Sequence, residues 1–164
     1  MSVRRAAPGD ESIVRELRLA ALADAPDAFN STLEQERART TADWSRWISN
    51  GATFLFEEAD CPKGIAAGVP YGGEPSARLL MAMWVEPRLR GSGAAAALVA
   101  SVLAWAAADG ASEVVLHVGK LNDRARRFYE RAGFRANGHG FVSEWTGIEE
   151  IEMRRPLALE AGAP

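Results

Sequence analysis

Two glycines lie where an apolar run ends and an apolar helix is expected to begin. Gly91 and Gly93 follow the run Leu80–Val85 and precede an Ala- and Leu-rich segment that ends at Gly110. The first amides of a helix lack intrahelical partners and lie at the positive end of its dipole, so they bind phosphate well. The loop therefore predicts a pyrophosphate site, with an ordinary strand-to-helix turn as the alternative. The predicted contacts are Arg90, Gly91, Ser92, Gly93, Ala94, Ala95 and Ala96.

Two familiar phosphate-binding loops fit these glycines poorly. A nucleotide triphosphatase loop needs a lysine after its last glycine, and none follows here. A dinucleotide-binding fold needs Gly-x-Gly-x-x-Gly/Ala, which residues 91–96 satisfy, and an acidic residue at the end of the next strand. Glu113 instead opens that strand, and residues 86–90 separate the first glycine from the strand before it. Both interpretations are disfavoured.

The stretch instead resembles motif A of the GCN5-related N-acetyltransferase (GNAT) superfamily, Arg/Gln-x-x-Gly-x-Gly/Ala. Arg90, Gly93 and Ala95 match that motif. A second stretch resembles motif B of the family, Asn-x-x-Ala-x-x-x-Tyr-x-x-x-Gly-Phe. Its matching residues are Asn122, Ala125, Tyr129, Gly133 and Phe134. The two motifs cover residues 80–135, and residues 152–157 resemble the last strand of the family.

The resemblance implies that acetyl-coenzyme A is the cosubstrate and that no metal takes part. The pyrophosphate would lie on the glycine loop, and the pantetheine arm would enter between two parallel strands that splay apart beyond Val85 and Val118. Tyr129 would lie near the thioester sulfur as the catalytic acid, although a core aromatic is the alternative. The arm would contact the backbone of Met83, Trp84 and Val85 and the side chain of Asn122, which can also simply cap its helix.

The implied reaction is the direct attack of a primary amine, on a small molecule or a protein, on the thioester in a ternary complex. An amine of pKa about 10.4 loses its proton near pH 7.4 at a cost of roughly 4 kcal/mol, so a base is needed. Many relatives carry a glutamate on the central strand, but Leu80–Val85 contain no acid. A non-catalytic acyl-CoA-binding sensor is therefore the alternative function. Glu34, Glu36, His117 and His139 are further candidates for the base, each of them also explained as a solvated or packed residue.

The acceptor site is expected in the first half of the chain, which supplies what the two motifs do not. Trp44 and Trp47 share one helical face with Ile48, a pattern that is more often core. Their place just after the first helix also matches where the resembled family has substrate-binding elements. The residues predicted for the acceptor are Phe29, Glu34, Trp44, Trp47 and Tyr71.

The elements that must position these residues follow from periodicity, capping and turn signals. The sequence predicts an α+β fold of the GNAT type, with a mixed, mostly antiparallel sheet and a central parallel strand pair flanked by helices. Strands are expected at 3–6, 52–56, 63–69, 80–85, 113–118, from 134 and at 149–153. Helices are expected after Asp10, Thr41 and Asn122 and over the segment between the glycine loop and Gly110. The cluster Gly138-His139-Gly140 is expected to interrupt the chain.

Length and composition bound the remaining possibilities. The 164 residues predict one domain over 1–164, with a frayed tail at 158–164. A net charge of -3 argues against a nucleic-acid partner, and no segment predicts a membrane partner. One cysteine, Cys61, and a polar N-terminus predict a cytoplasmic protein. The sequence leaves the identity of the acceptor open. It also leaves the oligomeric state open, with a homodimer as one option.

Overall fold

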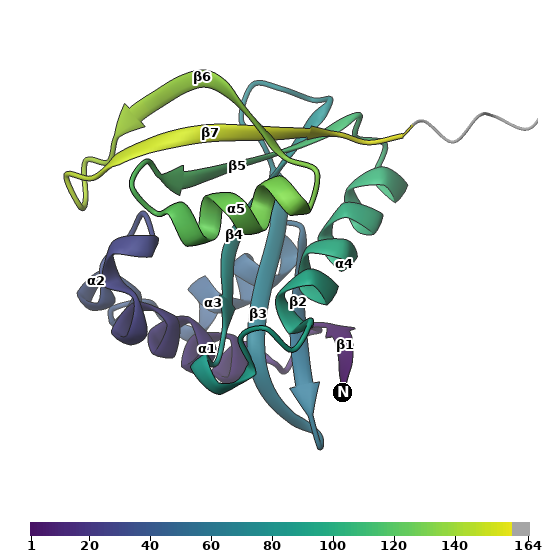
Figure 1. Cartoon of the computed structure of the whole chain (residues 1–164). Coiled ribbons are helices and arrows are strands. Elements are labelled where there is room, and N and C mark those ends of the chain that lie inside the picture. The colour runs from purple at the N-terminus through teal and green to yellow at the C-terminus, as the bar shows by residue number, and fades with distance from the viewer. Residues whose placement is uncertain (159–164) are drawn as a thin grey trace, which may run out of the picture.

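A seven-stranded mixed sheet organises the computed structural model, which describes residues 1–158 (Figure 1). The strand order is β1-β2-β3-β4-β5-β7-β6. The strands are β1 (Ser2–Arg5), β2 (Ala52–Glu58), β3 (Cys61–Pro70), β4 (Ala77–Val85), β5 (Glu113–Gly119), β6 (Arg135–Val142) and β7 (Glu149–Pro156). The predicted α+β class and mixed sheet are confirmed. Residues 159–164 of the predicted frayed tail lie outside the described residues.

The strands β4 and β5 are the parallel pair that the sequence predicts, and they part early. Their pairing joins only Ala77, Arg78 and Leu79 to Glu113, Val114 and Val115. Every other neighbouring pair of strands is antiparallel. The sheet therefore opens from Leu79 and Val115 onward, well before Val85 and Val118, where the separation was expected.

A bulge lies in β4 directly beside this opening. Ile65 of β3 pairs with Trp84, and Ala67 pairs with Met81, so one residue of β3 faces two residues of β4. Ala82, one of those two, has a φ of 57°, which is uncommon for a residue with a side chain. Bulges re-aim a strand and interrupt its ladder. The strained residue thus directly precedes Met83, Trp84 and Val85, which the sequence assigns to the cosubstrate.

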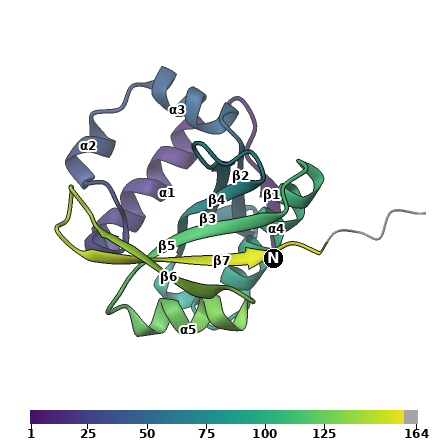
Figure 2. The ribbon, with the colours of Figure 1, turned by 90° about the horizontal axis from the view of Figure 1, so that it is seen from above.

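Helices cover the two faces of the sheet, as the view from above shows (Figure 2). The helices α1 (Glu11–Asp24), α2 (Leu33–Arg37) and α3 (Thr41–Ser49) lie on one side, with a 3-10 turn at Pro26–Ala28. The helices α4 (Ala94–Ala108) and α5 (Asp123–Arg131) lie on the other, after a 3-10 turn at Pro87–Leu89. Each face has its own core. Trp44, Ile48 and Trp84 belong to the first core, and Leu98, Val102 and Phe134 belong to the second.

Three local predictions are wrong in detail. Asp10 does not cap α1 with its side chain, because its carboxylate accepts from the Ala7 amide and pairs with Arg4. The side chain that caps α3 belongs to Thr40 rather than Thr41. Residues 138–140 do not interrupt the chain: β6 runs through them with a shift in register, because glycines fit an irregular ladder.

Candidate functional site

The glycine loop forms the N-terminus of α4 and leaves backbone donors free. Gly93 precedes the helix with a φ of 93°, in the left-handed region that favours glycine. The Ala94 amide is 3.4 Å from Ser92 Oγ, whereas no group in residues 1–158 accepts from the amides of Gly93, Ala95 or Ala96. A Cβ built on Gly93 would meet no atom within 4 Å. The loop therefore presents an open cradle of unpaired amides at a helix N-terminus.

The side chain of Arg90 has a partner in this structure. Its guanidinium pairs with Asp24 at the end of α1 and is one-third exposed. The same carboxylate accepts from Trp84 Nε1 at 3.0 Å, so Asp24 ties the loop to both β4 and α1. Arg90 thus anchors the loop, and an anion on the loop would meet the backbone amides with Arg90 beside them.

Two motif B residues belong to the region of α5: Asn122 directly precedes the helix, and Tyr129 lies within it. Asn122 caps the helix, because its Oδ1 accepts from the Ala125 amide at 3.2 Å. The Tyr129 ring packs at 5.1 Å from the Phe128 ring and 5.9 Å from the Phe134 ring. Burial raises the pKa of the Tyr129 phenol. The raised pKa favours the neutral phenol, in which the hydroxyl is a hydrogen-bond donor.

A cavity of about 280 Å³ lies against β4 where that strand has lost β5 as a neighbour. Residues 79–82 of β4 form its floor, beside the bulge. The other lining residues come from the helical region before β2 and from β5 and β7: Arg18, Ala28, Phe29, Asn30, Ser31, Glu36, Arg39, Trp47, His117 and Glu150. A second hollow of about 600 Å³ shares Arg39, Trp47 and Met81 with it, so the two adjoin.

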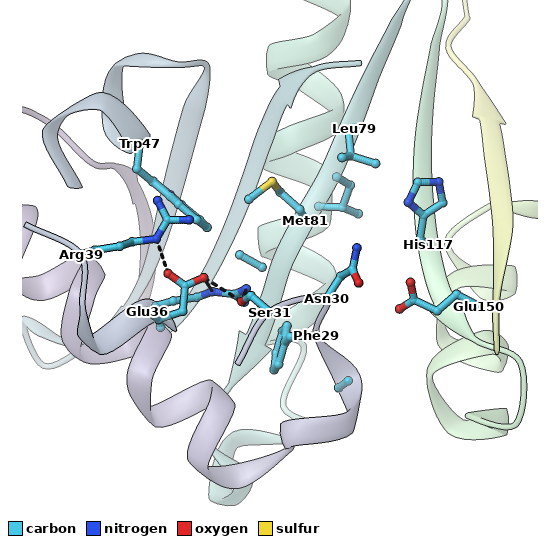
Figure 3. A pocket seen from close by; sticks show the side chains of 14 residues that line it. Phe29, Asn30, Ser31, Glu36, Arg39, Trp47, Leu79, Met81, His117 and Glu150 are labelled. Atoms are coloured by element: carbon cyan, nitrogen blue, oxygen red, sulfur yellow. Dashed lines mark hydrogen bonds and ion pairs between the residues drawn. The ribbon is translucent and has the colours of Figure 1, made fainter. Parts of the chain in front are cut away.

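Charged side chains gather on the wall built by α1 and α2. Glu36 is 1% exposed and pairs with Arg39 at 2.5 Å and with Arg18 at 3.5 Å. Ser31 Oγ donates to Glu36 at 2.7 Å and accepts from Arg18 at 3.0 Å. Figure 3 shows Glu36 joined to Arg39 and Ser31 beside the cavity. Burial lowers the pKa of Arg18, and Glu36 opposes that effect.

Two proton acceptors stand on the opposite wall. Glu150 on β7 is 5% exposed, and its Oε2 has no hydrogen-bond partner in the described part of the chain. Burial raises the pKa of Glu150. His117 on β5 faces the same space, and burial lowers its pKa although Glu152 opposes the shift. Figure 3 shows Glu150 and His117 pointing into the gap, with Asn30 facing them. The raised pKa makes the Glu150 carboxylate a stronger proton acceptor, whereas the lowered pKa of His117 makes its imidazole a weaker one.

A network of ion pairs and hydrogen bonds among side chains adjoins His117. Tyr71 donates to Glu152 Oε1 at 2.9 Å and lies 3.4 Å from His117 Nε2. Burial by itself raises the pKa of Glu152, but hydrogen bonds from Arg154, Asn137 and Tyr71 hold it down at about 2. Arg154 also pairs with Glu74 and Glu113. The network fixes the environment of the His117 ring.

Only two of the five residues that the sequence predicted for the acceptor line the cavity. Phe29 and Trp47 line the cavity, and Tyr71 lies behind it. Trp44 is 1% exposed in the core, and Glu34 is exposed on α2, so neither lines it. Glu36 faces inward instead, because residues two apart on a helix point in different directions. His139 lies exposed on β6.

Several lining residues carry no signal that the sequence alone reveals. Arg18 and Glu150 are polar residues at buried positions, and a polar residue in a periodic pattern is normally assigned to the solvent side. The segment of α2 is only five residues long, too short for periodicity to show which of its glutamates is buried. The alternation in residues 149–153 was visible, yet it did not indicate that the polar face of β7 meets a cavity.

No helix within residues 1–158 has both the length and the apolar character that crossing a membrane requires. No group of three or more metal-binding side chains of the histidine, cysteine, aspartate or glutamate type is found in the same range.

Known proteins that resemble this chain in sequence are named N-acetyltransferases. The chain is 31% identical over 115 residues to N-acetyltransferase 8F1 of Rattus norvegicus, covering 66% of this chain and 52% of that protein. It is 49% identical over 59 residues to an uncharacterized N-acetyltransferase of Mycobacterium tuberculosis, covering 36% of this chain and 38% of that one. The chain thus spans about half, or less, of the length of the curated relatives it matches.

Solved structures share the fold. A protein of Salmonella typhimurium, solved with its cofactor acetyl-CoA, superposes with a TM-score of 0.79 at 18% identity, covering 100% of this chain and 98% of that one. The family model described as the acetyltransferase (GNAT) family matches residues 18–134, which include the glycine loop, the parallel strand pair and Tyr129. The chain therefore belongs to the GNAT acetyltransferase family.

Proposed function

We propose that this protein transfers the acetyl group of acetyl-CoA to a primary amine. One observation carries the proposal: the sheet opens at Leu79 and Val115 between a phosphate-binding helix terminus and a cavity with proton acceptors. A donor on one side of the opening and an amine on the other would meet within it. The transfer then depends mostly on positioning the two reactants.

The residues on the cosubstrate side fit acetyl-CoA. Unpaired amides at the start of α4 suit a pyrophosphate, and Gly91 and Gly93 leave the approach free of side chains. On the edge that faces β5, residues Leu80 to Val85 of β4 have no strand partner, and they would offer backbone groups to the pantetheine arm. Asn122 begins α5 beside the end of β5 and is proposed to contact the same arm. Acetyl-CoA would supply an activated acetyl group held as a thioester.

The proposed base is a residue that the sequence analysis did not single out. Glu150 is buried, has one unpartnered oxygen and has a raised pKa, so it is the proposed acceptor of the proton from the incoming amine. His117 beside it is the second candidate. Tyr129 is the proposed donor to the leaving sulfur, because burial keeps its phenol protonated. These roles divide the two proton transfers between two sides of the sheet.

An acceptor screen tests the proposal. The protein is incubated with acetyl-CoA and a panel of amines, and the release of coenzyme A is followed with a thiol reagent. Release that depends on the amine supports acetyl transfer. Tight binding of acetyl-CoA with no amine-dependent release in any member of the panel would favour the non-catalytic sensor.

Three further predictions remain proposals. One core runs from Phe56 to Met153 and the other from Ala6 to Trp84, and both pack on the same continuous sheet, which supports one domain. The proposed partners are acetyl-CoA and an amine, without nucleic acid. The cytoplasmic location follows from the sequence prediction alone.

A further inference from the structure

The α1–α2 wall of the cavity carries two arginines and a single carboxylate. Arg18 and Arg39 both pair with Glu36. Guanidinium groups keep their protons at neutral pH, so with Glu36 ionised this wall has an excess of one positive charge. Arg18 Nη2 donates to Ser31, but Arg18 Nη1 is buried and has no hydrogen-bond partner within residues 1–158. A buried charged donor without a partner is costly unless a ligand supplies an acceptor.

Aromatic rings hold the Arg18 guanidinium in place. Its central carbon lies 4.7 Å from the centre of the Phe29 ring and 5.6 Å from that of Trp47. Arg39 lies 5.5 Å from the centre of the Trp47 ring. A guanidinium fixed in this way presents a planar fork, which matches the two oxygens of a carboxylate. Its orientation is set before any ligand enters.

The opposite wall holds Glu150 and His117, so the cavity is cationic on one side and accepts protons on the other. We propose that the amine acceptor also carries a carboxylate, as a free amino acid does. Its carboxylate binds Arg18 and Arg39, and its amine faces Glu150 and His117. This inference rests on the proposed acetyl transfer and narrows its acceptor to small amino acids or close analogues.

The bonds and protons of the proposed transfer are accounted for by the reactants, Glu150, Tyr129 and solvent. The amine enters as an ammonium ion, and Glu150 takes the first proton and releases it to solvent. A bond forms between the nitrogen and the acetyl carbon while the carbon–sulfur bond breaks. Tyr129 gives a proton to the sulfur and regains one that derives from the nitrogen. The products are the N-acetyl amino acid, coenzyme A and one proton.

Matched acceptors test the carboxylate directly. Each of several amino acids is compared with its amide and with the amine that lacks the carboxyl group, and kcat/KM is measured for all three. We expect the acid to be preferred at least tenfold, within the range of a hydrogen bond between charged groups. In the Arg18→Gln variant the ratio of acid to amide should fall toward one. The Arg15→Gln variant, on the same helix and outside the cavity lining, should keep the ratio.

A second variant covers the chance that Arg18→Gln unfolds. Arg39 is more exposed, at 38% of its side chain, and Arg39→Gln should lower the same ratio in a folded protein. Equal use of acids and amides would overturn the inference and leave acetyl transfer standing. Without turnover of any amine, the melting temperature in the presence of coenzyme A decides: a rise with amino acids but not with their amides supports the carboxylate site, and the same response to both overturns it.

Discussion

The glycine loop before α4 and the proposed acceptor cavity are built in opposite ways. The loop uses backbone amides from one continuous segment, and its side chains are small. The cavity uses side chains from α1, α2, β5 and β7, and its chemistry depends on buried charges. A backbone site tolerates changes in side chains as long as the chain conformation survives. A site built from side chains changes its specificity when one residue changes.

This difference matches the roles of the two regions. The proposed cosubstrate would be held by its pyrophosphate and its pantetheine arm, for which backbone groups suffice. The proposed acceptor would be selected by the charged side chains of the cavity. Variants on the two sides should therefore affect different kinetic constants, and the predictions below use that separation.

The largest effect is expected from Glu150→Gln. Glutamine keeps the shape but cannot take a proton, so turnover should fall by about 10³-fold, within the range for acid–base catalysis. Binding of acetyl-CoA, measured by calorimetry, should stay unchanged. The fold should be kept, because the unpartnered buried charge is removed. Glu149→Gln, which is next to it, exposed and paired with Lys120, is the control. Normal turnover in Glu150→Gln would point to His117 as the base.

Acid should weaken the network behind the acceptor cavity. Glu152 has a pKa of about 2 in the folded protein against an ordinary value of 4.5. A lowered pKa stabilises the folded state above pH 4.5, and that contribution is lost as the pH falls toward 2. The shift corresponds to on the order of 3 kcal/mol. Urea unfolding at pH 5 and pH 3 measures the loss, and the Glu152→Gln variant should show a smaller difference between the two. An equal difference would assign the acid sensitivity to other carboxylates.

Tyr129→Phe should lower turnover by roughly 10²-fold while acetyl-CoA affinity stays within a few fold. The ring still packs on Phe128 and Phe134, and only the donor to the sulfur is lost. Steady-state kinetics and a melting curve of the same sample separate catalysis from stability. Turnover near that of the wild type would show that water protonates the sulfur.

The smallest effect is expected on the cosubstrate side. Gly93→Val places a branched side chain in the cradle at a φ of 93°, so acetyl-CoA should bind more than tenfold more weakly, about 1.4 kcal/mol. The KM of the amine should change much less. Gly72→Val is the control, since a Cβ at Gly72 also meets no atom within 4 Å and its φ is not positive. Equal weakening for both substrates would contradict the separation of the two sides.

The sequence predicted one of these regions far better than the other. The loop, the helix that follows it and the parallel strand pair are local features with fixed spacing, so glycines and periodicity revealed them. The base did not appear in Leu80–Val85, because the candidate Glu150 lies on β7, which joins β5 only in the folded sheet. Arg18 was not singled out in the sequence, and its burial became visible only in the packing of Phe29 and Trp47 around it.

The early separation of β4 and β5 also has a mechanical consequence. The sheet has a half made of β1 to β4 and a half made of β5, β7 and β6, and the strand ladder between these halves covers only Ala77–Leu79 and Glu113–Val115. So short a ladder is expected to act as a hinge about which the two halves of the sheet move. A ligand arm that bonds to both edges would stiffen the sheet, so amide hydrogen exchange along β4 should slow when acetyl-CoA binds. Departure of the product would loosen the same ladder.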